Sequence, residues 1–333
     1  MVESPTDGIV SDGGPLLLDD TGEASLLRRA AAEFVGTALL VAVGAGTATV
    51  LALGPLRRLE SLASVFGTSP TAEANNKVFG TLLGTAGASL GDVLGVALAF
   101  AFILAVLVYA LGGVSGAHFN PAVTFALACV RRFRWTDVPI YWIAQCAGGV
   151  GGAFLIAMMY RGEGATFKGT DILFGATTYS SGGTQFFQGL AAEALITFIL
   201  VFAIMAVAVD TRAPKGWSGI VIGIALGSGV LLAGPATGGS ANFARSLGPF
   251  VASMVYDAKS IPWHDLYLYA LGPIVGAVIA AFAYESITGL EVAAPAPQPG
   301  AATPDAGIEP PPSDPYTPPP SDPYTPPPSG PTE

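Results

Sequence analysis

The chain has 333 residues, of which 51% are hydrophobic and only 11% are charged, and its formal net charge is −10. Soluble domains have roughly a quarter of their residues charged, so this composition excludes an ordinary soluble enzyme and indicates a membrane protein. The acidic balance argues against a nucleic-acid partner. The two cysteines (Cys129 and Cys146) and two histidines (His118 and His264) are too few for a disulfide framework or a metal cluster. We therefore expect neither a metal nor a cofactor.

Six apolar stretches are long enough to cross the hydrocarbon core, which takes about 20 residues. They are 30–53, 93–112, 138–160, 189–209, 217–236 and 266–287. Two shorter apolar pieces, 121–130 and 243–254, each follow a Gly/Ser-rich break that contains an asparagine. Irregular backbone at membrane depth is tolerated only against protein or a water-filled cavity. The sequence therefore predicts an all-α membrane protein with six transmembrane helices and two re-entrant half-helices. Two such half-helices at matching places indicate a substrate site at the interface of the repeats.

An internal repeat relates segment 30–160 to segment 189–287. The stretch that begins at Glu33 resembles the stretch that begins at Glu193, and the segment around Asn120 resembles the segment around Asn242. The glycine-rich run at 148–152 matches 272–276. Each copy contains three spans, so the second copy enters the membrane from the opposite face. We therefore expect inverted repeats. The Glu-to-Asn spacing is 87 residues in the first half and 49 in the second, which predicts an inserted loop over 54–92.

Two tails flank this predicted domain of residues 30–287. Residues 1–29 form an acidic tail without the basic-then-apolar order of a secretory signal, so insertion is expected to depend on the first span. Residues 288–333 are proline-rich and repeat Ser-Asp-Pro-Tyr-Thr-Pro-Pro-Pro twice, which predicts an extended, solvated tail. A docking or phosphorylation role, with an unknown partner, is the alternative for this tail. The arginines of the short connecting segments favour an orientation with both termini cytoplasmic. We expect a multi-pass protein of the plasma membrane.

Asn120 and Asn242 are the central candidate residues. Each lies where a helix N-cap is expected, and asparagine is a favoured cap. Pro121 follows at the first helical position, where its missing N–H is tolerated. If the half-helices enter from opposite faces, their N-termini meet, and both asparagine amides can donate to one passing oxygen. Each helix end carries roughly half a positive charge, which repels cations and interrupts proton relay.

Glu33 and Glu193 lie at equivalent places near the starts of two spans. A buried carboxylate is costly unless it is hydrogen-bonded, so we expect each to accept hydrogen bonds from the backbone of a broken loop and to brace it. A proton-relay carboxylate is the alternative, although a relay usually needs several acids or histidines in series.

The segment from Ser115 to Thr124, which reads Ser-Gly-Ala-His-Phe-Asn-Pro-Ala-Val-Thr, resembles the first signature of the aquaporin (major intrinsic protein) family. The core of the first signature is Asn120, Pro121 and Ala122. The second signature is Asn242, Phe243 and Ala244 followed by arginine, and it matches except that Phe243 replaces a proline. We expect the fold to tolerate Phe243, with its ring packed against Pro121 and the central width slightly changed. The resemblance implies a homotetramer in the lipid bilayer with one pore per subunit, and it assigns His118 a loop-bracing role, with pH gating as the alternative.

The resemblance also places a selectivity filter, by spacing from the two asparagines, at Phe100, Val230, Gly239 and Arg245. Arg245 then offers donors to the permeant and rejects cations. Strict water channels of the family usually have histidine at the Val230 position, so valine and glycine imply a wider, partly apolar ring that suits glycerol or urea. Segment 233–242 also resembles the nodulin-like members. Against this reading, Ser246 stands where glycerol facilitators typically have aspartate.

The sequence is thus identified as a member of a family of passive channels and is not expected to be an enzyme. We expect water and small uncharged solutes of the glycerol or urea type to permeate, and ions and protons to be excluded. The alternatives are a strictly water-selective channel and a non-conducting structural member of the family. A proton-coupled transporter and an ion or gas channel are rival classes, which the lack of paired acids and the presence of Arg245 disfavour.

Overall fold

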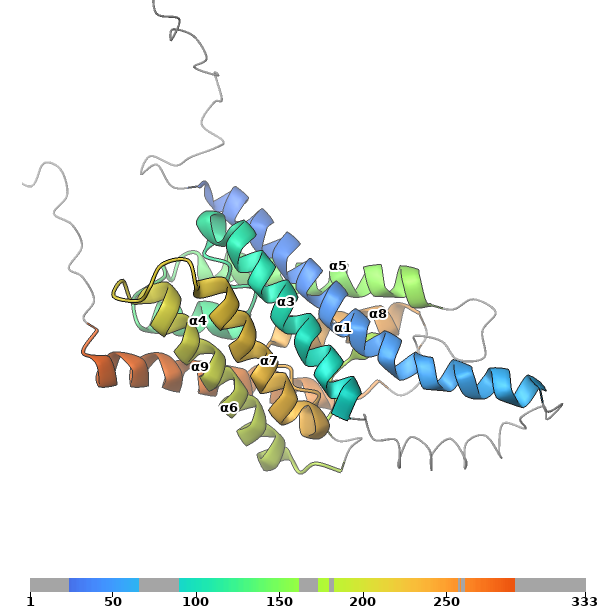
Figure 1. Cartoon of the computed structure of the whole chain (residues 1–333). Helices are drawn as coiled ribbons and strands as arrows, with labels where there is room; N and C mark the ends of the chain where they lie inside the picture. The colour runs from blue at the N-terminus through green and yellow to red at the C-terminus, as the bar shows by residue number, and fades with distance from the viewer. Residues whose placement is uncertain are drawn as a thin grey trace, which may run out of the picture. The chain divides into compact units, whose positions relative to one another are not determined.

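A computed structural model describes residues 24–65, 90–161, 173–179, 183–256, 258 and 261–290, with only the backbone described at 54–65 and 90. This part of the chain is helical (Figure 1). Its helices are α1 (Leu26–Val65), α3 (Leu90–Ser115), α4 (Pro121–Cys129), α5 (Val138–Tyr160), α6 (Phe186–Ile204) with its π-helical continuation η3 (Met205–Val209), α7 (Ser218–Thr237), α8 (Phe243–Val255), the 3-10 turn η4 (Trp263–Asp265) and α9 (Leu266–Thr288). Within the described ranges, six helices are long and apolar enough to cross a membrane. The predicted fold class is confirmed.

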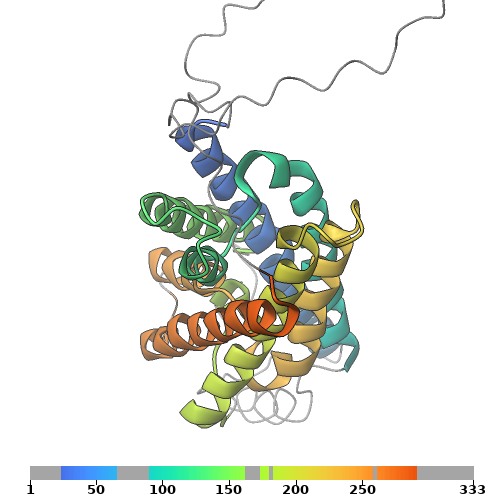
Figure 2. The same ribbon diagram turned by 90° about the vertical axis from the view of Figure 1, so that its left-hand side faces the viewer.

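The helices pack as two equivalent sets. In the first set α1 packs against α3 and α5, and in the second set α6 packs against α7 and α9 in the same way. The half-helices exchange partners between the sets, because α4 packs against α9 while α8 packs against α5. Both half-helices lie between α5 and α9, as Figure 2 shows. This arrangement is that of the predicted inverted repeat.

Close helix contacts depend on two equivalent glycines. A side chain at Gly148 of α5 would overlap the carbonyl oxygen of Phe34 in α1, and one at Gly276 of α9 would overlap the carbonyl oxygen of Ala194 in α6. The structural equivalence is therefore Gly148 with Gly276, one helical turn later than the sequence match of 148 with 272. The sequence register was wrong because both helices are rich in glycine and alanine, so that several alignments one turn apart look equally good.

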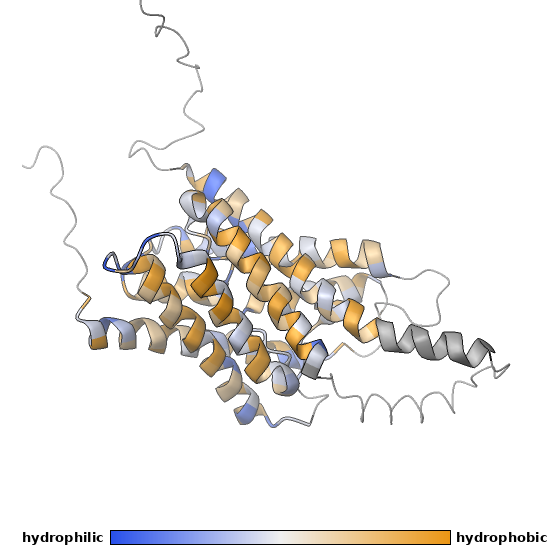
Figure 3. Ribbon diagram, in the orientation of Figure 1, coloured by the Kyte–Doolittle hydropathy of each residue, from blue (hydrophilic) through white to orange (hydrophobic). Residues whose placement is uncertain are grey.

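The outer surface of the bundle is apolar, as a lipid-facing surface must be. Figure 3 shows hydrophobic residues along the visible faces of α1, α3 and α7. Large apolar side chains are exposed on every long helix, among them Phe102, Ile143, Met158, Leu195, Ile224 and Ile279. In water so large an apolar surface would cause aggregation, whereas in a bilayer it is the surface expected to face the lipid.

The helix boundaries differ from the predicted ones at three places. Helix α1 begins at Leu26 rather than at 30, because Ser25 accepts a hydrogen bond from the Arg28 backbone N–H at 3.5 Å and starts the helix before the arginines. The same helix continues to Val65, so the predicted loop over 54–92 is wrong for 54–65 and for the start of α3 at Leu90. Gly-Pro at 54–55 is unfavourable inside a helix, but the leucine- and arginine-rich residues after it favour helix. Residues 66–89 lie outside the described residues.

The termini fall outside the described part as well. The chain divides into a unit Met1–Val292 and a second unit Ala293–Glu333. Helix α9 ends at Thr288, where the proline-rich tail was predicted to begin, and residues 291–333 are not among the described ones. The predicted state of the two tails therefore stays a prediction.

Candidate functional site

Two reciprocal hydrogen bonds join the N-terminal ends of the half-helices. Asn120 Nδ2 donates to the carbonyl oxygen of Ala241 at 2.7 Å, and Asn242 Nδ2 donates to the carbonyl oxygen of Phe119 at 2.8 Å. Both asparagine side chains are buried, with 4% of each residue exposed. A side-chain amide carries two N–H donors. Each asparagine therefore keeps a second donor beyond the bond that ties the two loops together.

The side-chain oxygens of the same asparagines cap the half-helices. Asn120 Oδ1 accepts from the Ala122 backbone N–H at 3.0 Å. Asn242 Oδ1 accepts from the backbone N–H groups of Ala244 and Arg245 at 3.0 and 3.3 Å. Both asparagines have extended backbone, as N-caps do. Because the oxygen is committed to the helix, the amide nitrogen is fixed in orientation and points away from it.

The loops that lead into the two asparagines have the same unusual backbone. Positive φ angles occur at matching offsets before each asparagine, at Gly116, Ala117 and Phe119 in the first loop and at Gly238, Gly239 and Ala241 in the second. A left-handed conformation costs roughly 1–2 kcal/mol for a residue other than glycine. Alanine and phenylalanine adopt it here, so other contacts must hold these loops in place.

Glu33 of α1 supplies those contacts for the first loop. Its carboxylate accepts from the backbone N–H groups of His118 and Phe119 at 3.0 and 2.6 Å. It also accepts from Ser115 Oγ at 2.7 Å and from Gln145 Nε2 at 2.8 Å. The side chain is fully buried. These four hydrogen bonds are the contacts that the expected loop-bracing role requires.

Glu193 of α6 has the equivalent position in the second loop. It accepts from the backbone N–H groups of Ser240 and Ala241 at 2.9 and 2.7 Å, and from Thr237 Oγ1 at 2.7 Å. It is also fully buried. Neither glutamate has a second acid or a histidine side chain among its described hydrogen-bond partners, so the geometry offers no proton relay through them.

Sequence reasoning missed two tyrosines that complete this bracing. Tyr141 donates its hydroxyl to the carbonyl oxygen of Ser115 at 2.8 Å, and Tyr269 donates to the carbonyl oxygen of Thr237 at 2.6 Å. Each tyrosine therefore holds the C-terminal end of the helix that precedes a broken loop. Both lie seven residues before the equivalent glycines Gly148 and Gly276, and the correct repeat register would have identified them.

His118 lies in the first loop, between the membrane-spanning helices. Its Nδ1 is 3.0 Å from Thr124 Oγ1, and its ring packs against Phe133 and Tyr141 with centroids 4.9 and 5.2 Å away. Burial, together with the nearby positive charge of Arg29, lowers the pKa of His118 to about 3. The imidazole is therefore neutral near pH 7. This geometry fits a bracing residue better than the alternative of a pH gate.

Of the four filter residues expected from the resemblance, the structure brings two pairs into contact. The guanidinium of Arg245 lies 5.2 Å from the centre of the Phe100 ring, and Arg245 Nη1 donates to the carbonyl oxygen of Gly175 at 3.0 Å. A side chain at Gly239 would approach the Cα atom of Val230 at 3.0 Å, so these two residues lie side by side. Arg245 is 2% exposed, and its Nε has no hydrogen-bond partner in the described part of the chain.

Phe243 begins α8, where proline begins α4. Its ring is half-buried, and helix α8 forms with the same asparagine cap as α4. The predicted packing of Phe243 against Pro121 is not tested by any described contact. The carbonyl oxygen of Pro121 instead accepts a hydrogen bond from Trp142 Nε1 at 3.0 Å.

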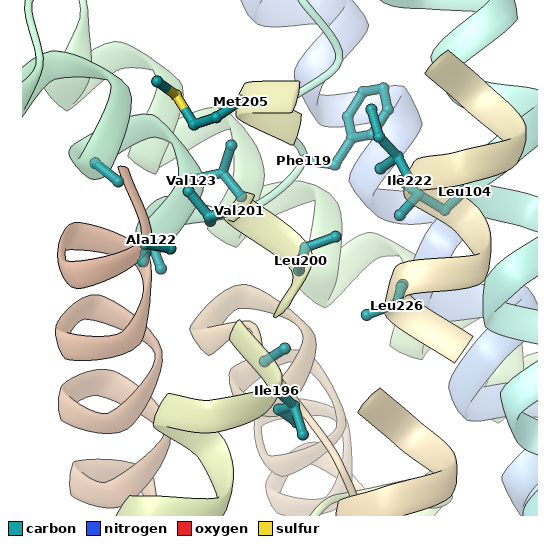
Figure 4. Packing of buried hydrophobic residues seen from close by; sticks show 14 of the residues in the cluster. Leu104, Phe119, Ala122, Val123, Ile196, Leu200, Val201, Met205, Ile222 and Leu226 are labelled. Atoms are coloured by element: carbon teal, nitrogen blue, oxygen red, sulfur yellow. The ribbon is translucent and has the colours of Figure 1, made fainter. Parts of the chain in front are cut away.

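A cavity of about 200 Å³ lies on the first-loop side of the asparagines. Its polar lining includes His118 and Arg132, and its apolar wall comes from α3, α4, α6 and α7. Figure 4 shows part of this wall, with Leu104, Val123, Leu200 and Ile222 near the first loop. An apolar wall with a few polar groups is typical of a site for small polar molecules.

The pseudo-symmetry connects this cavity to the expected filter. Phe100 lies 20 residues before Asn120, whereas Val230 and Gly239 lie 12 and 3 residues before Asn242 and Arg245 lies 3 residues after it. The same offsets counted from the other asparagine give their counterparts in the opposite repeat. The counterparts of Phe100, Val230, Gly239 and Arg245 are Ile222, Val108, Ala117 and Val123. All four counterparts line the cavity. Because the repeats are related by inversion, the filter residues belong at the corresponding place on the second-loop side.

No group of three or more His, Cys, Asp and Glu side chains that could hold a metal occurs in the described segments. What these segments do contain is a bilayer-spanning bundle of inverted repeats, with two half-helices that meet N-terminus to N-terminus beside a cavity. These features define a channel-type membrane protein, in which irregular backbone lines a path at membrane depth.

The chain belongs to the major intrinsic protein family, whose family model matches residues 21–284. It is 40% identical to aquaporin AqpM of Methanothermobacter marburgensis over 264 residues, which is 79% of this chain and 98% of that protein. It is 38% identical to nodulin-26 of Glycine max over 193 residues, 58% of this chain and 65% of that protein. The X-ray structure of the aquaglyceroporin from Plasmodium falciparum has the same fold, with a TM-score of 0.60 at 21% identity over 79% of this chain and 97% of that one. The protein therefore belongs to a family of passive membrane channels.

Proposed function

We propose that this channel conducts water and small neutral solutes of the glycerol or urea type and excludes ions and protons. The observation that carries the proposal is the fixed pair of Asn120 and Asn242. One amide N–H of each donates to the opposite loop, and the second N–H is used by no described contact. Two donors at one place bind the oxygen of a passing molecule and leave its hydrogens pointing outward. A file of water molecules held in this way cannot relay a proton through the centre.

Positive charge supports the exclusion of cations. The N-termini of α4 and α8 both lie at the centre, and each carries roughly half a positive charge. Arg245 adds a full charge on the second-loop side. A guanidinium has five N–H donors, and Gly175 takes up one of them among the described contacts. The remaining donors are suited to a hydroxyl or carbonyl oxygen of a neutral solute.

The composition of the expected filter supports a solute larger than water. Gly239 has no side chain and Val230 has an apolar one, so this wall of the ring is wide and apolar. Arg245 supplies the polar wall. Glycerol and urea have both polar groups and less polar surfaces, and this ring matches that division. The 38% identity to nodulin-26 agrees with this proposal, because segment 233–242 resembles the nodulin-like members.

A strictly water-selective channel is the second candidate. The ring of Phe100 lies 5.2 Å from the Arg245 guanidinium, which favours a narrower passage. Osmotic measurements on proteoliposomes separate the two candidates. In a sucrose step, rapid shrinkage reports water permeability; in a glycerol step, shrinkage followed by re-swelling reports glycerol entry. Shrinkage without re-swelling would establish the water-selective channel, and the absence of rapid shrinkage would indicate a non-conducting member of the family.

We further propose a homotetramer with one pore per subunit in the plasma membrane, with both termini cytoplasmic. The family membership and the exposed apolar surfaces of the long helices support this assembly. Native mass spectrometry from detergent gives the subunit number. Protease accessibility of the proline-rich tail in sealed, oriented vesicles gives the side on which the C-terminus lies.

A further inference from the structure

The ring of Phe100, one of the expected filter residues, lies against a glycine of the first helix. A Cβ atom added at Gly44 of α1 would overlap this ring, and its three nearest heavy atoms outside its own stretch of helix would all be ring carbons of Phe100. Both residues are buried, and Phe100 is 3% exposed. One edge of the ring therefore lies directly on the backbone of α1, in the space that any other residue would fill with its own side chain.

Gly44 differs from the glycines at the helix contacts. At Gly148 and Gly152 of α5, the nearest atom that blocks a side chain is a backbone carbonyl oxygen of α1, so these glycines let two helices approach closely. At Gly44 the blocking atoms belong to one side chain. Glycine is less favourable than alanine inside a helix, because it loses more conformational freedom on folding. The ring of Phe100 supplies the physical reason for a glycine at this position.

The face of the same ring is turned toward the filter arginine. The guanidinium carbon of Arg245 lies over it, 5.2 Å from the ring centre. Gly44 is on the buried side of α1, whereas its neighbour Val43 is on the exposed side. A side chain at position 44 would therefore push the ring inward and change its separation from the guanidinium. In this way a residue of α1 controls the distance between two filter groups.

The opposite repeat divides the same volume differently. Counted from the bracing glutamates, the counterpart of Gly44 is Ile204 of α6. The counterpart of Phe100 is Ile222 of α7, and both isoleucines line the cavity on the first-loop side. Glycine and phenylalanine on one side of the asparagines thus correspond to two isoleucines on the other. The glycine belongs to the side on which a large flat ring faces a guanidinium.

We propose that Gly44 is a specificity-determining positioning residue of this channel, which holds the Phe100 ring against α1 and thereby sets how wide the filter is beside Arg245. The size of the solute that passes then depends on a residue that does not itself touch the solute. This inference rests on the proposed function, because it takes Phe100 and Arg245 as filter residues. The contact between Gly44 and Phe100 does not depend on that function.

Gly44→Ala places one methyl group in the space of the ring edge. We expect the ratio of glycerol to water permeability in proteoliposomes to fall about tenfold, because one methyl group more or less in a pocket discriminates substrates by at least roughly that factor. Gly36→Ala is the matched control, since a Cβ atom there would overlap the ring of Phe119, which is not a filter residue. It should lower stability without changing the ratio. An unchanged ratio in Gly44→Ala, or an equal change in Gly36→Ala, would overturn the proposal.

A second control tests the addition of a methyl group to α1 as such. A Cβ atom at Gly46 would meet Ile156 Cγ1 at 3.5 Å, which is an ordinary contact. Gly46→Ala should therefore leave both permeabilities and the unfolding temperature as they are in the wild type. A fall in the ratio equal to that in Gly44→Ala would show that any added methyl group in this helix has the effect, and would overturn the role of the Phe100 ring.

A double-mutant cycle with Phe100→Ala isolates the contact itself. The ring is absent in this background, so Gly44→Ala should no longer change the permeability ratio. It should also lower the unfolding temperature much less than it does in the wild type, because the overlap has been removed. Equal effects of Gly44→Ala in the two backgrounds would overturn the proposal.

The same measurements separate this proposal from the proposed function. If wild-type vesicles pass water but no glycerol, the proposed solute class fails, and the position of the ring is read from water permeability instead. Gly44→Ala should then lower water permeability in the wild type and not in the Phe100→Ala background. If the vesicles pass neither, the proposed function fails, while the unfolding temperatures of the cycle still report the contact, and a lack of coupling between them would overturn it.

Discussion

The two sides of the central asparagines are built alike and lined differently. Each side has a glutamate that braces a loop with positive φ angles, a tyrosine that holds the preceding helix end and an asparagine that caps a half-helix. The linings then diverge. On the first-loop side the symmetric ring is entirely apolar, whereas on the second-loop side the same positions include the charge of Arg245. The bracing is therefore shared by both repeats, while under the proposed function we expect discrimination between permeants to depend on the second.

The bracing also differs in its outer contacts. In the first loop, Gln145 donates to both Glu33 and Thr124. The equivalent residue of α9 is Pro273, which cannot replace it. The second loop instead uses a chain of hydroxyls, in which Ser246 Oγ lies 2.6 Å from Ser240 Oγ and 2.7 Å from Thr177 Oγ1. The first loop is thus tied to its own repeat, and the second is tied to the connecting segment 173–179.

The largest effect is expected from removal of the bracing carboxylates. Glu33→Ala removes the acceptor of four donors, at about 1–3 kcal/mol for each buried donor. Glu193→Ala leaves two backbone donors without an acceptor, because the Thr237 hydroxyl also reaches the carbonyl oxygen of Ala233 at 3.2 Å. We expect both variants to lose most of their folded protein, Glu33→Ala more severely. Thermal unfolding in detergent, followed by size-exclusion chromatography, measures this. Wild-type stability in either variant would contradict the bracing role.

Replacement of each asparagine by aspartate tests the symmetric centre. Asn120→Asp and Asn242→Asp keep the capping oxygen but lose the donor to the opposite loop, and they place a negative charge against a carbonyl oxygen. Because the two cross-loop bonds are 2.7 and 2.8 Å long, we expect similar losses, about 1–3 kcal/mol in each variant. We also expect a measurable cation leak in proteoliposomes. A large loss in only one variant would show that the two loops are not equivalent at the centre.

The placement of selectivity on the second-loop side is tested by Val230→His. A larger polar side chain in the filter should reduce glycerol flux several-fold while reducing water flux less. The matched control is Val108→His, the symmetric position, which lines the cavity on the opposite side. Equal losses of water and glycerol flux in Val230→His, or the same selectivity change in Val108→His, would mean that the ring is misplaced.

A smaller effect distinguishes the outer contacts of the two loops. Gln145→Ala and Thr177→Val each remove hydrogen bonds to a loop without removing the glutamate, and we expect a loss of about 1 kcal/mol in each case. Gln145→Ala should change stability but not the ratio of glycerol to water flux. Thr177→Val should change that ratio, because Thr177 holds Ser246, which follows Arg245 directly. A change in the ratio of glycerol to water flux in Gln145→Ala, and none in Thr177→Val, would contradict this assignment of the outer contacts.

The smallest effect is expected from pH. The pKa of His118 is about 3 in the folded protein and 6.5 in an unfolded chain, so the unfolded chain binds more protons between these values. The stability from the neutral imidazole is fully present above pH 6.5 and is lost as pH falls toward 3. Water permeability should therefore stay constant from about pH 8 to 5, while the unfolding temperature declines slightly toward pH 5. A step in permeability near pH 6.5 that His118→Gln abolishes would establish pH gating.

The sequence predicted those parts of the site that depend on local chemistry. Asn120 and Asn242 were visible because a capped half-helix has its signature within a few residues, and Glu33 and Glu193 because buried acids are rare in apolar spans. Tyr141, Gln145 and Thr177 were not found, since their partners lie far away in sequence and ordinary residues of these types carry no local signal. The extension of α1 to Val65 was missed because Gly-Pro at 54–55 normally ends a helix.

The central claim is that two asparagine amides face a single wet path where the half-helices meet. A high-resolution density map of the full chain in lipid nanodiscs tests it most directly. We predict ordered water within hydrogen-bonding distance of Nδ2 of both Asn120 and Asn242, continuous with the cavity that His118 lines. A map in which apolar side chains seal both amides from water would contradict the claim.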